Sequence, residues 1–283
     1  MGVFQNNLLA GAAAAASAGG GGFYSHQIEQ SARFDADSTA SNSSYLTKTF
    51  STVDSSVHWT LNFWIKRAAI GGTRPSGSAN PLDIFTPRSG TSGSVLNEFK
   101  FSSPTAGNTA GDALMIVNTN SNNIVLSTDN LFRNTSGWYN FHIQADLDNG
   151  TNSEKLKYFI NGTEASYNTD NRGSYTSLPG IAAGAWTIGE YYGINGYPLQ
   201  SYLAQWAFVD GTTYAPTVFA ESKNGVWIPK DPTGTTFGTN GFHLKFQDSS
   251  ALGDDSSGNT NDFSTNGSPG ADHQVLDSPT FGS

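Results

Sequence analysis

The sequence predicts an all-β protein folded as a two-sheet antiparallel jelly-roll sandwich. Apolar and polar residues alternate along several short segments, and turn-forming residues separate these segments. Charged residues make up only 13% of the chain, against roughly 25% in an average soluble domain. Gly, Ser, Thr and Asn fill the difference, as expected of many short strands joined by many turns.

The alternation is clearest in residues 57–66, where Trp59 and Leu61 alternate with Thr60 and Asn62. A strand buried on one face has this period of two, and an amphipathic helix does not. The strands expected on this basis, in chain order, are 27–34, 45–50, 57–66, 82–85, 95–101, 113–117, 124–127, 138–145, 155–160, 186–189, 202–209 and 242–247.

Two Asn-Gly pairs mark predicted turns or helix ends. Asn161-Gly162 directly follows an apolar strand, and its preference for positive φ favours a tight hairpin. Pro216 has the position of a first helical residue, and Asn224-Gly225 then marks the end of a short helix. About a dozen antiparallel strands and one short helix imply two packed sheets.

The chain divides into three parts: a leader at 1–26, the sandwich at 27–248, and an extended polar segment at 249–283 that packs on the sandwich or a neighbour. The leader combines an Ala-rich stretch at 11–18 with four consecutive glycines. It lacks a basic residue before Arg33, which argues against a secretory signal. The alternatives are a flexible tether and an anchor that binds a partner. The anchoring residues would be Val3, Phe4, Leu8 and Leu9.

Charge and composition exclude several classes of protein. A net charge of −9 with only 14 Lys and Arg residues argues against a partner that is a nucleic acid. No stretch approaches the roughly 20 apolar residues of a membrane span. The absence of cysteine excludes disulfides, thiolate zinc sites and cysteine nucleophiles.

Several segments, in order, resemble the concanavalin A-like, laminin G-like sandwich. They are SARF (31–34), SYL (44–46), WTLNFWIKR (59–67), GWYNF (137–141), KYFING (157–162), YLAQWAFVDG (202–211), GVWIPK (225–230), NGFHLKF (240–246) and DSSGNTND (255–262). The segments FYSHQIEQ (23–30) and WIPK (227–230) are similar to laminin G-like proteins of tailed phages. This resemblance implies a virion component whose partners are other capsid or tail proteins. Fold alone does not fix function, because this sandwich hosts lectins, glycosidases and scaffolds.

The sequence offers little for catalysis. Glycosidases of this architecture place two or three carboxylates on one strand, but none of the six glutamates has an acidic residue at i+2 or i+4. Glu190 is the best isolated candidate for an acid. No nucleophile elbow is present, and His58, His142 and His243 occupy the polar phase of strands, which predicts surface histidines.

A calcium site is an alternative in the C-terminal segment, and no other cofactor is expected. Hard oxygen ligands of the kind that Ca²⁺ selects concentrate in one glycine-bearing loop. The other interpretation of this loop is an Asx-rich turn whose side chains bond their own backbone. The candidate ligands are Asp254, Asp255, Asn259 and Asp262, with Asp248 and Asn261 beside them.

A tyrosine-rich segment at 191–197 has the composition of a glycan-binding loop, since aromatic side chains stack on sugar faces while amides bind hydroxyls. The candidates are Tyr191, Tyr192, Asn195 and Tyr197, with Asn168, Asp170, Asn171 and Arg172 as further polar contacts. Equally, these tyrosines fit a contact between subunits.

The resulting hypothesis is a non-enzymatic phage virion protein on the virion surface: a tail fibre, a tail accessory, or a capsid decoration or head fibre. Its N-terminus would anchor it, its lectin-like sandwich would face the medium, and it would form a homo-oligomer. The alternative is a carbohydrate-binding module that recognises a host-surface glycan. A glycan hydrolase is the second alternative.

Overall fold

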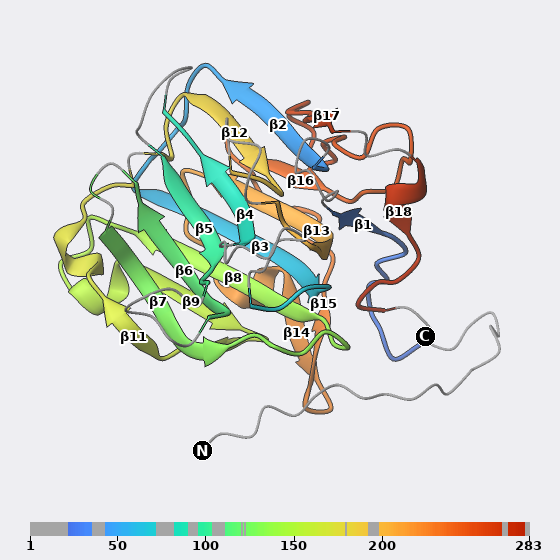
Figure 1. The fold of residues 1–283 in the computed structure, drawn as a ribbon, viewed down its shortest axis with the longest axis horizontal. Helices are drawn as coiled ribbons and strands as arrows, with labels where there is room; N and C mark the ends of the chain where they lie inside the picture. The colour runs from blue at the N-terminus through green and yellow to red at the C-terminus, as the bar shows by residue number, and fades with distance from the viewer. Residues whose placement is uncertain are drawn as a thin grey trace.

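The computed structural model describes residues 22–35, 43–71, 82–89, 96–103, 111–119, 121, 123–178, 180–191, 198–267 and 271–280. Within these ranges the chain forms two eight-stranded antiparallel sheets and a separate hairpin. Figure 1 shows the strands of one sheet in front of those of the other. The predicted anchor residues Val3, Phe4, Leu8 and Leu9 lie outside the described residues.

The first sheet is centred on two ten-residue strands. Its strand order is β10 (Thr163–Glu164), β9 (Leu156–Ile160), β8 (Tyr139–Asp146), β3 (His58–Arg67), β13 (Ser201–Asp210), β1 (Ser31–Phe34) and β18 (Gln274–Val275), with β16 (Phe242–Leu244) also paired to β13. The register of β3 on β8 is unbroken from His58 opposite Asp146 to Ile65 opposite Tyr139.

The second sheet covers the apolar side of the first. Its strand order is β11 (Tyr167–Asp170), β7 (Asn123–Leu131), β6 (Ala113–Asn118), β5 (Asn97–Phe101), β4 (Leu82–Pro87), β12 (Gly184–Ile188), β2 (Tyr45–Phe50) and β17 (Ser264–Asn266). Four single-turn 3₁₀ helices connect strands: η1 (Asn152–Glu154), η2 (Arg172–Ser174), η3 (Pro216–Val218) and η4 (Ala271–His273).

Aromatic side chains fill the space between the sheets. The rings of Phe63 and Trp206 stack with centroids 4.4 Å apart, and Trp186 meets Phe208 edge to face at 5.0 Å. Offset and edge-to-face pairs of this kind add about 0.5–1.5 kcal/mol each beyond the area they bury. The core therefore supplies stability that this cysteine-free chain cannot draw from disulfides.

A third layer lies on the outer side of the first sheet. It is the hairpin of β14 (Ala220–Lys223) and β15 (Val226–Pro229), and Trp227 Nε1 donates a hydrogen bond to Asn140 Oδ1 at 3.0 Å. A small second core forms beneath it from Ile28, Trp64, Ala204 and Ala220, with Trp138 and Trp227 at its edge.

The predicted helix from Pro216 to Asn224 is wrong. A three-residue 3₁₀ turn follows Pro216, and the chain then enters β14. Asn224 and Gly225 have φ of 54° and 80°, the positive values of a type I′ hairpin turn. Asn161 and Gly162, with φ of 49° and 78°, confirm the hairpin predicted there.

The expectation of surface histidines is wrong for two of the three. His142 and His243 are 0% and 3% exposed, because the hairpin and neighbouring loops cover the polar side of the first sheet. His142 Nε2 lies 2.9 Å from the carbonyl oxygen of Tyr214. His58, at the start of β3, keeps a partly exposed side chain.

The C-terminal segment contributes an edge strand to each sheet. β17 pairs with β2, and β18 pairs with β1. Lys66 on β3 forms an ion pair with Asp277 at 2.6 Å. The segment therefore closes one edge of both sheets.

Gly162→Ala is expected to lower the unfolding free energy by about 2–3 kcal/mol, since a left-handed φ costs an L-residue about 1–2 kcal/mol and the new Cβ meets Trp227. A Cβ built at Gly162 lies 2.6 Å from the indole ring. Urea denaturation followed by tryptophan fluorescence measures the change. Gly150→Ala is the matched control, because Gly150 has no heavy atom within 4 Å of its Cβ position. Equal stability of the two variants would contradict the packing of the indole on this turn.

Candidate functional site

Polar side chains line the outer side of the second sheet. On β4, Leu82, Ile84 and Phe85 belong to the core, and the register with β5 shifts between Asp83 and Phe85. Alternation before and after this irregularity directs Asp83 and Thr86 to the other side. The same argument places Glu98 and Lys100 of β5 and Thr187 of β12 on that side, since their neighbours Phe99, Phe101, Trp186 and Ile188 are in the core. We call Asp83, Thr86, Glu98, Lys100 and Thr187 the polar face.

The polar face is continuous across three strands. Asp83 is directly opposite Lys100 in the β4–β5 register, and Thr86 is directly opposite Thr187 in the β4–β12 register. Lys100 Nζ contacts Glu98 Oε2. Side chains directly opposite one another on adjacent strands lie about 4.5–5.5 Å apart at Cβ, so the five residues form one compact group.

Asp83 is the unusual member of this group. Its side chain is fully buried, and neither carboxylate oxygen has a hydrogen-bond partner. The hydroxyls of Thr86 and Thr187 are also buried without a partner. Most buried polar atoms in proteins are hydrogen-bonded, and each exception suggests water, an ion or a ligand. The polar face therefore has unused hydrogen-bonding capacity.

Burial raises the pKa of Asp83 well above its usual range, with Lys100 opposing this effect and the nearby Glu98 and Glu190 adding to it. A carboxyl group with a raised pKa keeps its proton at higher pH, so it both donates and accepts hydrogen bonds. Lys100 brings one positive charge to a group that holds three acidic side chains, Asp83, Glu98 and Glu190. The site therefore favours a group that bonds a neutral carboxylic acid.

The structure brings the predicted candidate Glu190 to this group. Glu190 is 4% exposed and close enough to Asp83 to affect its pKa. Tyr191, the first residue of the predicted glycan-binding segment, follows it directly. Tyr192, Asn195 and Tyr197 lie outside the described residues. The criterion of two or three carboxylates on one strand does not identify Asp83 and Glu98, because Asp83 lies on β4 and Glu98 on the adjacent strand β5.

Three of the four predicted calcium ligands, Asp255, Asn259 and Asp262, are used by the protein itself. Asp255 accepts hydrogen bonds from the backbone N–H groups of His243, Ser257 and Asn261. Asp262 accepts one from the Asp255 N–H, and Asn259 Nδ2 donates to the Gly238 and Gly241 carbonyls. These bonds follow the pattern of an Asx-rich turn. Asp254 is exposed, and slight desolvation, with Asp262 and Asp248 next, raises its pKa.

Among the described residues, one group has the ligand geometry of a metal site. His58, Asp146 and Asp148 place one ligand atom each within 4.8 Å of one another. Their atoms already bond each other, since His58 Nε2 lies 3.1 Å from Asp146 and 2.9 Å from Asp148. Asp83, Glu98 and Glu190 do not form such a convergent group.

A serine, a histidine and an aspartate also meet where the C-terminal segment crosses β2. Ser44 Oγ lies 2.9 Å from His273 Nε2, and His273 Nδ1 lies 3.3 Å from Asp272. Ser44 is 1% exposed and its hydroxyl also donates to Asp35. The Ser44 hydroxyl is already bonded to Asp35 and His273 within the chain, so the cluster fastens the C-terminal segment to the sandwich.

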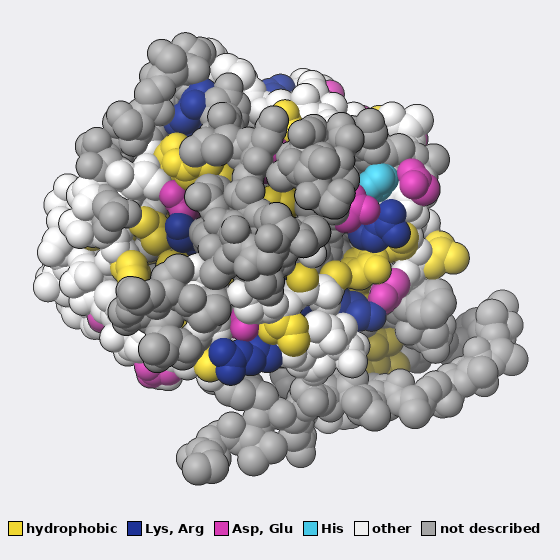
Figure 2. All heavy atoms as spheres, viewed as in Figure 1, with side chains coloured by type: hydrophobic (Ala, Val, Ile, Leu, Met, Phe, Trp, Pro, Cys, Tyr) yellow, Lys and Arg dark blue, Asp and Glu magenta, His cyan; other side chains and the backbone are white. Residues whose placement is uncertain are grey.

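Figure 2 shows Lys and Arg side chains in small separate groups on the face it presents. No described helix is long and apolar enough to cross a membrane.

Comparison with known proteins finds likeness in structure. No family model matches the chain, and no curated protein matches its sequence. A proposed carbohydrate-binding protein from Bacteroides ovatus superposes with a TM-score of 0.53 at 13% identity, over 85% of this chain and 59% of the other. This chain therefore spans about three fifths of that protein's length.

Two further structures are similar at lower scores. The SAP-like pentraxin of Limulus polyphemus gives a TM-score of 0.44 at 17% identity, over 68% of this chain and 80% of its own. Domains LG4-5 of the mouse laminin α1 chain give 0.39 at 11% identity, over 66% and 43%. The antiparallel two-sheet architecture and the likeness to the Bacteroides ovatus protein confirm the predicted fold: the chain is an all-β, two-sheet antiparallel sandwich.

Proposed function

We propose that the protein binds a glycan at the polar face and does not cleave it. The observation that carries this proposal is the fully buried carboxyl of Asp83, with both oxygens lacking a protein partner. Sugar hydroxyls both donate and accept hydrogen bonds, and they match a neutral carboxylic acid flanked by two threonine hydroxyls. The Bacteroides ovatus structure, described as binding carbohydrate, supports the same class of ligand.

The arrangement favours binding over hydrolysis. A glycosidase requires one carboxyl group as acid and a second, ionised one as base or nucleophile across the scissile bond. Glu98 is instead hydrogen-bonded to the ammonium group of Lys100, so its carboxylate is already paired within the chain. We expect no release of reducing sugar from any polysaccharide that binds.

Asp83→Leu is expected to weaken glycan binding by about tenfold or more, since losing one hydrogen bond to a buried ligand costs at least about 1.4 kcal/mol. A glycan array run with and without calcium identifies the ligand, and calorimetry then measures Kd for the wild type and the variant. Leucine removes an unpaired buried carboxyl, so the fold is expected to be retained. Near-ultraviolet circular dichroism checks this.

Asp254→Asn is the matched control, because Asp254 lies in the C-terminal loop and carries an exposed carboxyl. Its Kd should equal that of the wild type. Unchanged affinity in Asp83→Leu, or an array without any binding, would remove the proposal.

The second proposal is that the protein acts on a virion surface as a homo-oligomer. The resemblance of residues 23–30, the lead-in segment, to laminin G-like proteins of tailed phages supports it. In the structure this segment is bonded to the sandwich. Ile28 N–H donates to Thr280 Oγ1 at 2.8 Å, and Ser25 Oγ donates to Glu221 at 2.6 Å. A partner bound by the leader would thus be held at a defined place on the sandwich. Deleting residues 2–22 should leave a folded protein that no longer enters particles, and normal incorporation would argue against this role.

A further inference from the structure

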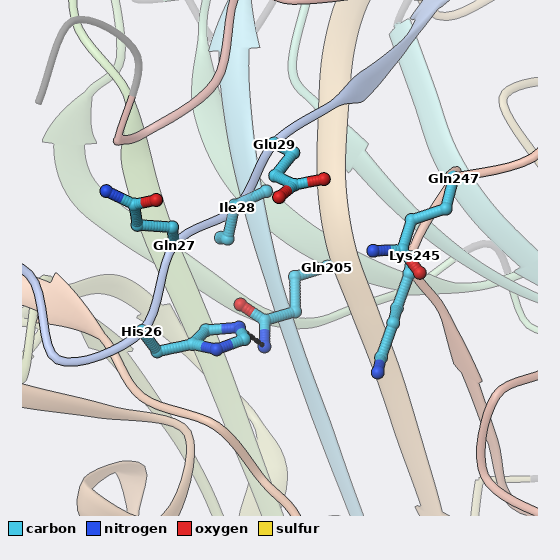
Figure 3. Close-up of a pocket in the computed structure, with 7 residues that line it drawn as sticks. All are labelled: His26, Gln27, Ile28, Glu29, Gln205, Lys245 and Gln247. Atoms are coloured by element: carbon cyan, nitrogen blue, oxygen red, sulfur yellow. Dashed lines mark hydrogen bonds between the residues drawn. The ribbon is translucent and has the colours of Figure 1, made fainter. Parts of the chain in front are cut away.

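A pocket opens on the other side of the molecule, on the outer side of the first sheet. It lies between the lead-in segment, β13 and the chain that follows β16. Figure 3 shows Gln205 at its centre, with His26 beside it, Glu29 above it, and Lys245 and Gln247 across from it. The cavity volume is about 40 Å³, which is room for about two or three water molecules.

Gln205 is presented to this pocket by an irregularity in the longest strand pair. The register between β13 and β3 shifts between Ala204 and Ala207, and Gln205 has a left-handed φ of 48°. Phe246, between Lys245 and Gln247, has a φ of 57°. Non-glycine residues in this conformation are uncommon and often mark functional positions.

The side-chain amide of Gln205 is only half satisfied. Its Nε2 lies 3.1 Å from His26 Nε2 and 3.5 Å from the Lys230 carbonyl oxygen. Its Oε1 is buried without any hydrogen-bond partner, although the residue is only 5% exposed. A buried acceptor left unpaired is unfavourable, so a donor from outside the chain would stabilise the protein here.

The charges around the pocket balance. Lys245 brings one positive charge and Glu29 one negative charge, and neither forms an ion pair with another described residue. Burial, and secondarily Lys245, lowers the pKa of His26 against an opposing effect of Asp231, so the imidazole is neutral at pH 7. The pocket therefore favours an uncharged group that bonds both donors and acceptors.

We propose that this pocket binds adjacent hydroxyl groups of a neutral saccharide, as a second site separate from the polar face. One hydroxyl would donate to Gln205 Oε1, its neighbour would donate to Glu29, and a further hydroxyl would accept from Lys245. The cavity admits the edge of a sugar ring, while the rest of the ring stays in solvent. Sites on both outer sides of the sandwich would allow one molecule to bridge two glycan chains.

The test is a nuclear magnetic resonance titration of the Gln205 side-chain amide. Glucose, galactose and mannose are the neutral probes, and galacturonate and glucosamine are the charged ones. Each is added to about 50 mM, above the millimolar Kd expected of a few hydrogen bonds. At least one neutral sugar should shift the Gln205 signals, and Lys245→Met should weaken that binding by about tenfold. Lys48→Met, on the second sheet, is the matched control and should leave it unchanged.

Three results would overturn the proposal. They are no shift with any neutral sugar, binding of a charged sugar at least as tight as that of the best neutral one, and unchanged binding in Lys245→Met. Asp83→Leu separates this site from the polar face. The Gln205 shifts should persist in that variant even where binding at the polar face is lost, and their disappearance would mean that the two sites are not separate.

Discussion

Arg67→Met is expected to lower the unfolding free energy by about 3–5 kcal/mol, because removing one partner of a buried ion pair leaves the other charge uncompensated. The Arg67 side chain is fully buried. Its guanidinium donates to Asp112 Oδ1 at 2.9 Å, to the Phe132 carbonyl at 2.9 Å and to the Ala69 carbonyl at 2.8 Å. It also stacks on the ring of Phe101, with its central carbon 3.8 Å from the ring centroid.

The position of Asp112 makes this loss hard to compensate. Asp112 has a φ of 79°, and its carboxylate also accepts from the Gly71 N–H. Arg133 remains as a partner, but its side chain is 52% exposed, so water competes for it. Arg67→Lys should recover only part of the loss, because an ammonium group cannot bond three acceptors in one plane or stack on Phe101.

Urea denaturation of Arg67→Met, Arg67→Lys and the wild type measures these differences. Arg33→Met is the matched control, since the Arg33–Asp35 ion pair is exposed. Exposed pairs contribute about 0–1 kcal/mol. The network joins Arg67 on β3 of the first sheet to Asp112, which directly precedes β6 of the second. A loss below about 1 kcal/mol in Arg67→Met would show that this network does not hold the two sheets together.

Local sequence patterns predict the strands well where one face of the strand is apolar. They fail at Asn224-Gly225, because an Asn-Gly pair can either end a helix or form a hairpin turn. The sequence predicts the hairpin at Asn161-Gly162 because the apolar segment Tyr158-Phe159-Ile160 directly precedes it. Asn224-Gly225 has the same backbone conformation, but β14 packs on a small outer core rather than the main one. Its sequence therefore lacks the apolar alternation that identifies a strand.

The polar face illustrates a different limit. Asp83, Glu98 and Thr187 lie far apart in the sequence, and only the strand order β5-β4-β12 brings them together. Sheet order and register come from long-range pairing, which a local period of two does not contain. The side of the sheet on which each residue lies was predictable, but its neighbours across the strands were not. Glu190 is predictable from the sequence, because it is a single acidic residue directly after the predicted strand 186–189.

The buried histidines predict a strong loss of stability in acid. Burial lowers the pKa of His142 to about 4, against an opposing hydrogen bond to Tyr214. Burial, with Lys245 next, also lowers the pKa of His243 to about 4. An unfolded histidine has a pKa near 6.5. Between about pH 6.5 and pH 4, these histidines are protonated in the unfolded state but not in the folded state. The free energy of unfolding therefore falls as pH decreases through this range.

Each histidine is expected to cost about 2–3 kcal/mol between pH 7 and about 4.5, from 1.36 kcal/mol per unit of pKa difference. The two together reach about 5 kcal/mol, which is comparable to the whole stability of many domains. Asp83 acts in the opposite direction: its raised pKa means that the folded state gains a proton first as pH falls, which stabilises it. The net slope of the wild type is therefore smaller than the histidine contribution alone.

A comparison between variants isolates the histidines. His142→Gln keeps an amide able to bond Tyr214 and Asn62, and His243→Leu removes an imidazole whose Nε2 has no partner. The doubly substituted protein should lose about 5 kcal/mol less than the wild type between pH 7 and pH 4.5, whatever its stability at pH 7. Urea denaturation at both pH values measures this. Because Asp83 is present in both proteins, its contribution cancels. Equal pH dependence of the two would mean that both imidazoles take up protons inside the fold, and hence that the hairpin over the first sheet opens readily to water.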